Sequence, residues 1–359
     1  MRPPVDNGEA MMTGAASSRT HVARKADHIP ESIDTALTRL LGIRYPILQG
    51  GMQWVGRAEL AAAVSNAGAF GTISCLTQRT PDLLATEIAR CRTLTDKPFG
   101  VNLTILPTIN PPPYERYFDV AIEARVAAIE TAGAIPALYF SRANAAGIPV
   151  IHKCTTIRHA LSAQKRGAAM ISMDGFEAAG HPGEDDISGL VLIPLALRSL
   201  NAPILASGGI ATGAAMAAAL ALGAAGVTMG TRFCATREAP IHGAIKQAYV
   251  NAAATDTTLI FRTFGNTARV MRNAVSKEVL AIEQRNPGLD FSVIAPLVAG
   301  SRGRQALETG DFDAGLVWAS QVVGLIDDIP SCAELVNRIV AECVSRIEEL
   351  SRTLCSGRR

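Results

Sequence analysis

The clearest indication of the fold is the stretch Ala169-Met-Ile-Ser-Met-Asp-Gly-Phe-Glu-Ala-Ala-Gly-His181. It begins with a short apolar run, of the kind that forms a buried strand. A glycine-rich loop carrying a histidine follows at once. A strand that ends in such a loop is how parallel α/β proteins present reactive side chains at the carboxyl edge of a sheet. The stretch therefore predicts an α/β fold with a functional loop around His181.

The loop continues into the acidic run Glu184-Asp185-Asp186, which has two interpretations. Carboxylates at the start of a helix are stabilised by the helix dipole, so the run is interpreted as the N-terminal cap of the next helix. A metal site is the alternative, but His181 is the only further ligand type close by in the sequence. We therefore predict no metal site.

Apolar runs alternate with helical segments along the first two thirds of the chain. The candidate strands are 46–50, 70–75, 99–104, 127–132, 149–154, 169–173, 203–207 and 226–230, and helical segments between them include 58–66, 81–94, 156–166 and 213–222. Such alternation indicates parallel strands joined by crossover helices. Eight repeats favour a (β/α)8 TIM barrel. An open doubly wound sheet is the alternative, but no G-x-G-x-x-G or G-x-x-x-x-G-K-[ST] motif occurs.

The alternation divides the chain into four parts. Residues 1–35 are polar and aperiodic and are expected to be a disordered leader, and 36–239 form the barrel. Residues 240–330 are expected to form a smaller, mainly helical subdomain over the barrel mouth, with helical stretches at 242–253 and 267–285 and a turn at 300–303. Residues 331–359 are expected to pack back on the barrel as a helix, with an inward face formed by Leu335, Ile339, Val344 and Ile347.

The composition excludes several classes of protein. Of 359 residues, 48% are hydrophobic and 18% are charged, and the net charge is +2, which gives no reason to expect a nucleic-acid or membrane-surface partner. No apolar stretch is long enough to span a bilayer. The 7 cysteines include no C-x-x-C pair, and no secretory signal precedes them, so we expect free thiols and a cytoplasmic protein.

Two glycine turns follow the seventh and eighth predicted strands. In TIM barrels this corner often binds a phosphate, because glycines allow the backbone to approach the anion. The turns are Ser207-Gly208-Gly209 and Gly230-Thr231. They predict a phosphorylated cofactor or substrate; tight turns without a ligand are the alternative.

Other polar residues at strand ends converge on the same face. Amide and hydroxyl groups suit a heterocycle rich in amides, and a lysine could stabilise negative charge on a reduced ring. These residues are Gly51, Met52, Gln53, Asn102, Thr104, Lys153, Asp174 and His181. Because side chains alternate along a strand, His152 and Lys153 must point in opposite directions; we predict Lys153 inward and His152 as a structural residue.

Taken together, these motifs resemble the nitronate monooxygenases, formerly called 2-nitropropane dioxygenases. The resemblance runs from about Ile43 to about Leu350, and its motifs are Gln49-Gly-Gly-Met-Gln-Trp-Val-Gly56, Gly100-Val-Asn-Leu-Thr104, His152-Lys-Cys154, Asp174 to Asp186, Ala206-Ser-Gly-Gly209 and Met229-Gly-Thr-Arg-Phe233. Within the family, the chain looks most like a bacterial NAD(P)H:quinone reductase subgroup.

The resemblance implies an FMN cofactor and a catalytic role for His181. The FMN-binding role would fall on Gly51, Met52, Gln53, Asn102, Thr104, Lys153, Asp174, Ala179, Gly180, Ser207, Gly208, Gly209, Gly230 and Thr231.

Three functions follow from the resemblance and the residues. The first is oxidation of alkyl nitronates with O2, in which His181 serves as a base for neutral nitroalkanes. The second is reduction of a quinone by NADH or NADPH, with the loop 106–113 beside the nicotinamide entrance. The third is a non-catalytic flavin- or phosphate-binding barrel. A homodimer is compatible with each of them.

Overall fold

The structure is a computed structural model, and it describes residues 29–105, 111–286 and 288–355. Most of the predicted leader, residues 1–28, and most of the predicted entrance loop, residues 106–110, lie outside the described residues. Within the described ranges, no helix combines the length and the apolar character that a membrane crossing requires.

Eight parallel strands form the barrel, as predicted. They are β1 (Ile47–Gln49), β2 (Gly71–Ser74), β3 (Phe99–Ile105), β4 (Ile129–Gly133), β5 (Val150–Cys154), β6 (Met170–Asp174), β7 (Ile204–Ser207) and β8 (Gly226–Met229). Each strand pairs with the next in the chain from β2 to β8, and β8 pairs with β1. A parallel bridge between Leu48 and Phe70 joins β1 to β2, so the sheet closes on itself. The predicted (β/α)8 TIM barrel is confirmed.

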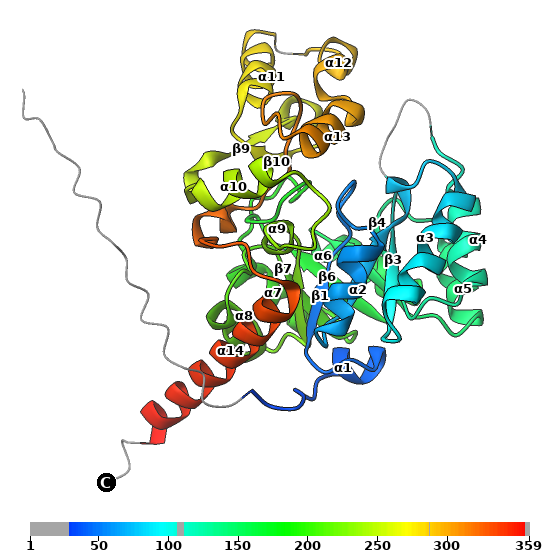
Figure 1. Cartoon of the computed structure of the whole chain (residues 1–359), viewed down its shortest axis with the longest axis vertical. Helices are drawn as coiled ribbons and strands as arrows, with labels where there is room; N and C mark the ends of the chain where they lie inside the picture. The colour runs from blue at the N-terminus through cyan, green and yellow to red at the C-terminus, as the bar shows by residue number, and fades with distance from the viewer. Residues whose placement is uncertain (1–28, 106–110, 287, 356–359) are drawn as a thin grey trace, which may run out of the picture.

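Helices alternate with the strands and surround them (Figure 1). Threonine side chains at positions 80, 156 and 212 begin three of these helices by accepting a hydrogen bond from a backbone N–H of the first turn. The helices are α2 (Ala58–Asn66), α3 (Pro81–Leu94), α4 (Tyr114–Glu123), α5 (Ala137–Ala145), α6 (Ile157–Lys165), α7 (Gly189–Ser199), α8 (Gly213–Ala221) and α9 (Thr231–Cys234), with the 3-10 turn η1 (Cys75–Thr77) after β2.

Helix α1 (Ala36–Leu41) closes the lower end of the barrel. Its Leu37 and Leu41 are buried and belong to the same apolar cluster as Leu48, Phe70 and Leu205 from the barrel strands. The functional end must therefore be the opposite, carboxyl end of the strands, where Figure 1 shows the helices α10 to α13.

Residues 240–330, which we call the second region, have an apolar core of their own. It includes Ile260, Val270, Val279 and Leu316. The elements are α10 (Gly243–Asn251), η2 (Ala254–Asp256), β9 (Thr257–Ile260), η3 (Arg262–Phe264), β10 (Ala268–Met271), α11 (Ala274–Arg285), η4 (Phe291–Val293), α12 (Ala295–Val298), α13 (Gly300–Thr309) and η5 (Gln321–Leu325).

Two local predictions in the second region are wrong. The stretch 267–285 was expected to be helical throughout, but its first part is strand β10, which pairs antiparallel with β9 before Asn273 caps α11. The expected turn at 300–303 is instead the start of α13. A side chain at Gly303 would come within 3.0 Å of the Leu316 carbonyl oxygen, so this glycine permits close packing rather than a turn.

The C-terminal helix α14 (Cys332–Cys355) packs against α8 and α2, as expected. A Cβ atom at Gly213 of α8 would lie 2.2 Å from the Ile339 carbonyl oxygen, so only glycine allows this approach. Leu335 and Ile339 are buried, and Val344 is half-buried. The prediction for Ile347 is wrong: it is 44% exposed, because the second half of α14 runs beyond the barrel (Figure 1).

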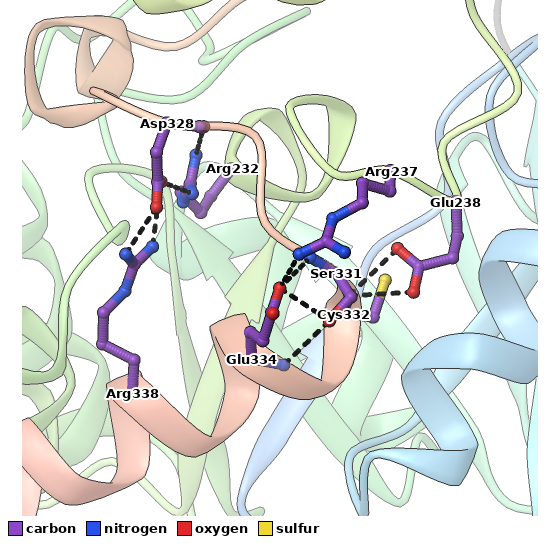
Figure 2. A network of polar contacts seen from close by, with 8 residues as sticks. All are labelled: Arg232, Arg237, Glu238, Asp328, Ser331, Cys332, Glu334 and Arg338. Atoms are coloured by element: carbon purple, nitrogen blue, oxygen red, sulfur yellow. Dashed lines mark hydrogen bonds and ion pairs between the residues drawn. The ribbon is translucent and has the colours of Figure 1, made fainter.

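A polar network fixes the start of α14 to the end of β8 (Figure 2). The buried Arg232 donates to Asp328 at 2.6 Å, and Arg338 of α14 pairs with the same carboxylate. Arg237 pairs with Glu334 beside them. The network anchors the chain where it returns from the second region to the barrel.

His152 is the structural residue that the alternation predicted. Its Nδ1 lies 2.8 Å from the Thr131 hydroxyl, and its ring meets Phe140 of α5 edge-on, outside the barrel. Burial lowers its pKa from 6.5 to about 4. The folded protein therefore keeps this imidazole neutral over a pH range in which the unfolded chain protonates it.

We expect His152 to make stability depend on pH between 6.5 and 4. The unfolded chain binds one more proton there. The burial of His152 therefore does not reduce the free energy of unfolding above pH 6.5, and it lowers that free energy by about 3 kcal/mol as the pH drops to about 4. Urea unfolding at several pH values measures this. A His152→Gln variant should lose that part of the slope, whereas His159→Gln, at an exposed position on α6, should keep it. Parallel slopes for the two variants would contradict the assignment.

Candidate active site

A cavity of about 580 Å³ opens at the carboxyl ends of the strands. This volume is in the range of cofactor sites. Every residue that the sequence predicted for the site lines it: Gly51, Met52, Gln53, Asn102, Thr104, Lys153, Asp174, Ala179, Gly180, His181, Ser207, Gly208, Gly209, Gly230 and Thr231. Residues from the ends of six strands thus meet in one place, as the carboxyl edge of a closed barrel requires.

The two glycine turns form one corner of the cavity. Gly208 and Gly209 have φ of +81° and +75°, in the left-handed region that glycine adopts without strain. A Cβ atom at Gly208 would lie 2.9 Å from the backbone nitrogen of Ala178. The turn after β7 therefore depends on glycine both for its backbone conformation and for its contact with the His181 loop.

Three ionisable side chains lie together at the base of the cavity wall or beside it: Lys153, Asp174 and Glu130. Lys153 Nζ is 3.5 Å from Asp174 Oδ2, and Glu130 on β4 lies beside them, 2% exposed. Burial opposes the charge on Lys153, but Asp174 and Glu130 outweigh it and raise its pKa. The ammonium group is therefore charged at neutral pH.

Glu130 supports the wall of the cavity, although the sequence did not single it out. Its Oε2 accepts hydrogen bonds from the Gly51 N–H at 2.7 Å and the Asn102 amide at 2.8 Å. Burial raises its pKa, and Lys153 opposes that shift. The sequence did contain a signal for Glu130, because it is the one carboxylate within the apolar run 127–132. Buried acids are rare unless they are paired, so such a residue indicates a buried polar contact.

We expect Glu130→Ala to lower the free energy of unfolding by about 3 kcal/mol or more. The change leaves the Gly51 N–H and the Asn102 amide without their acceptor and removes a partner of Lys153. Urea unfolding is the measurement, with Glu123→Ala on the exposed face of α4 as control, where less than about 0.5 kcal/mol is expected. Equal losses in the two variants would rule out the supporting role.

His181 lies on the side of the cavity nearest the second region. Its ring centroid is 5.8 Å from that of Trp318, and it is half-buried. Burial lowers its pKa, and the charge of Glu184 opposes that shift. At neutral pH the imidazole is therefore neutral and able to accept a proton.

The acidic run after His181 does not cap the next helix, so that interpretation is wrong. Helix α7 begins after Ser188 and has no acidic residue in its first turn. Glu184 and Asp186 instead bind Thr267 and Arg262 of the second region. The alternative interpretation was a metal site. Within the part of the chain that the structure describes, no three or more His, Cys, Asp or Glu side chains are grouped so that they could hold a metal ion.

Several cavity residues were not found by sequence reasoning, because they come from distant segments. Trp318, Ser320 and Tyr249 belong to the second region. The Tyr249 hydroxyl donates to the Trp318 carbonyl at 3.0 Å, and the Ser320 N–H donates to the Thr231 hydroxyl at 3.0 Å. The lining also includes Gln78, Arg79, Pro112, Tyr114 and Tyr117.

Comparisons with known proteins identify the family of the chain. A family model described as nitronate monooxygenase matches residues 34–342. The "(3aS,4S,5R,7aS)-5-hydroxy-7a-methyl-1-oxo-octahydro-1H-indene-4-carboxyl-CoA dehydrogenase" of Rhodococcus jostii is 32% identical, over 89% of this chain and 98% of that protein. A nitronate monooxygenase of Paraburkholderia phytofirmans is 31% identical, over 88% and 96%. The structure of FabK from Thermotoga maritima superimposes with a TM-score of 0.83 at 35% identity, over 89% and 99%.

Proposed function

The chain belongs to the nitronate monooxygenase family and is an oxidoreductase, and from this premise we propose that it uses FMN to oxidise alkyl nitronates with O2. The observation that carries the proposal is the position of His181. A neutral imidazole lines the same cavity as two glycine turns suited to a phosphate.

The cavity fits FMN on the chemistry of its lining. Asp174 Oδ1 is buried there without a hydrogen-bond partner among the described residues, which leaves an acceptor for a hydroxyl that a ligand would bring. The turns at Gly208 and Gly230 would hold the phosphate, and the charged Lys153 would lie beside the ring system. When bound, FMN would supply the redox chemistry, accepting electrons from the substrate and passing them to O2.

The protein's own residues have a limited task in this reaction. A nitronate is already deprotonated at carbon, so it needs only to be bound and oriented. A neutral nitroalkane must first lose its α proton, and His181 Nε2 or Nδ1 would accept it. Trp318 limits the position of the imidazole on one side and reduces its contact with water.

NAD(P)H:quinone reduction is the second candidate, and a specific observation favours it. The lining of the cavity also includes Gln78, Arg79 and Tyr114, which the proposed flavin site does not use. A cation and an aromatic ring in the lining suit a larger, anionic ligand such as NADH or NADPH. The relative named as a CoA dehydrogenase suggests the same for a CoA thioester, which is also large and anionic. The non-catalytic barrel is set aside, because the relatives are named as enzymes over nearly their whole length.

Anaerobic stopped-flow spectroscopy separates these functions. The FMN-loaded protein is mixed in turn with propionate 3-nitronate, NADH, NADPH and an acyl-CoA, and bleaching of the flavin is followed. Rapid bleaching by the nitronate supports the first proposal. Bleaching by NADH or NADPH alone would replace it with the quinone reductase. A purified protein that is colourless and takes up no added FMN would refute both.

A further inference from the structure

The His181 loop is bound at both ends to one segment of the second region, strand β10 and Thr267 directly before it. Before the histidine, Gly180 and Arg269 form an antiparallel bridge, with N–H···O distances of 3.1 Å in one direction and 2.6 Å in the other. After it, Glu184 accepts two hydrogen bonds from Thr267, one from its N–H at 2.7 Å and one from its hydroxyl at 2.5 Å. His181 thus lies between two anchors that are only two residues apart on the partner segment.

On the second region, both anchors use buried residues, whereas Glu184 itself is exposed. Thr267 is 1% exposed and Arg269 is 3% exposed. The Arg269 guanidinium donates to the Phe176 carbonyl at 2.9 Å and lies 4.5 Å above the ring of that residue. Hydrogen bonds that involve a charged group and are shielded from water hold their geometry more firmly than exposed ones. The exposed pair of Asp186 and Arg262, at 2.8 Å, adds a weaker contact.

Strand β10 also fixes Trp318, whose ring lies beside His181. Val270, next to Arg269 on β10, forms an antiparallel bridge with Trp318. The backbone of this short segment therefore sets the position of the loop through residues 267 and 269, and the position of Trp318 through residue 270. A shift of β10 would move both walls around the imidazole together.

We propose that Glu184 is a positioning residue for His181: by holding Thr267, it fixes the histidine loop to strand β10, so that the second region completes the active site. The inference rests on the proposed role of His181 as a base. It assigns a task to an acidic residue that would otherwise be a surface charge, and it makes docking of the second region a condition of proton transfer rather than of FMN binding.

The test compares Glu184→Ala, Glu184→Gln and Thr267→Val with Asp185→Asn, all as FMN-loaded protein. Asp185 is the matched control, because it is an exposed neighbour with no side-chain partner among the described residues. For a neutral nitroalkane, kcat of Glu184→Ala should fall on the order of 10- to 100-fold with KM nearly unchanged. The Gln and Val variants should show smaller losses, Asp185→Asn should stay within about twofold, and Kd for FMN should be unchanged throughout.

Hydrogen exchange of the loop distinguishes positioning from catalysis. Peptides covering residues 174–186 should exchange at least about tenfold faster in Glu184→Ala than in the wild type or Asp185→Asn. Unchanged exchange, or a wild-type kcat with FMN retained, would overturn the proposal. If Glu184→Ala does not fold, Glu184→Gln and Thr267→Val, which preserve side-chain volume, decide in the same way. A wild-type protein that oxidises neither a nitroalkane nor a nitronate would refute the proposed function, and the exchange measurement would still test the anchoring.

Discussion

Replacing His181 by alanine is expected to lower kcat/KM for a neutral nitroalkane by about 10²- to 10⁴-fold, the range typical of a lost general base. The neutral form needed to accept the α proton predominates because burial lowers the pKa of the imidazole. Turnover of a preformed nitronate should change far less, since that substrate carries no proton to remove. The ratio of the two activities therefore reports the proton transfer itself.

Steady-state O2 consumption with nitroethane and with ethyl nitronate measures this ratio. His159→Ala is the control: His159 is exposed on α6, and both of its activities should remain at the wild-type level. FMN content should be equal in all three proteins, because neither histidine belongs to the glycine turns proposed to hold the phosphate. If His181→Ala lost both activities to the same extent, the residue would act in binding or in orienting the flavin, and the base would have to be sought elsewhere.

The barrel could be predicted from sequence because each of its signals is local. A buried parallel strand is a short apolar run, and the segments between these runs have helical character of their own. Closure of the barrel brings all the carboxyl ends of the strands to one face. The order of the strands was therefore enough to predict that Lys153, Asp174 and the glycine turns share one cavity. No knowledge of long-range contacts was needed for that step.

The second region was predicted less well, because its structure depends on partners far away in the sequence. Residues 268–271 form a strand only because β9 lies beside them, and the same segment reads equally well as the start of a helix. The role of Glu184 was missed for the same reason: its partner Thr267 is 83 residues away. Trp318 gave no periodic signal at all. Local sequence patterns do not predict the contacts between the barrel loops and the second region.

The contacts between the barrel loops and the second region also matter for function. The glycine turns of the proposed phosphate corner follow strands β7 and β8 of the barrel, and the second region reaches them through the hydrogen bond from Ser320 to Thr231. His181, in contrast, is held by the second region through Gly180 and Glu184. Binding of the cofactor and proton transfer thus depend on different sets of contacts. Substitutions in the glycine turns should affect FMN affinity, and substitutions along β10 should affect turnover. The two sets of effects should be separable by measuring Kd and kcat on the same variants.

Gly208→Ala is the sharpest test of the phosphate corner, and we expect it to weaken FMN binding by roughly 100-fold or more. The left-handed backbone at φ +81° disfavours alanine by about 1–2 kcal/mol, and the new methyl group would lie 2.9 Å from the Ala178 nitrogen. The turn must therefore move. Loss of two hydrogen bonds to a charged phosphate costs about 3–6 kcal/mol, which corresponds to roughly 10²- to 10⁴-fold in Kd.

Gly147→Ala separates this loss from simple backbone strain. Gly147 has φ of +71° and lies after α5, and a Cβ atom there would meet nothing within 4 Å. Both variants should lose stability through the left-handed backbone, but only Gly208→Ala should lose FMN, as measured by quenching of flavin fluorescence during titration. Equal FMN affinities would place the phosphate elsewhere in the cavity. Because Gly208 also packs against the loop that leads to His181, a weakened kcat in FMN-saturated Gly208→Ala would show that the two sides of the site are coupled through Ala178.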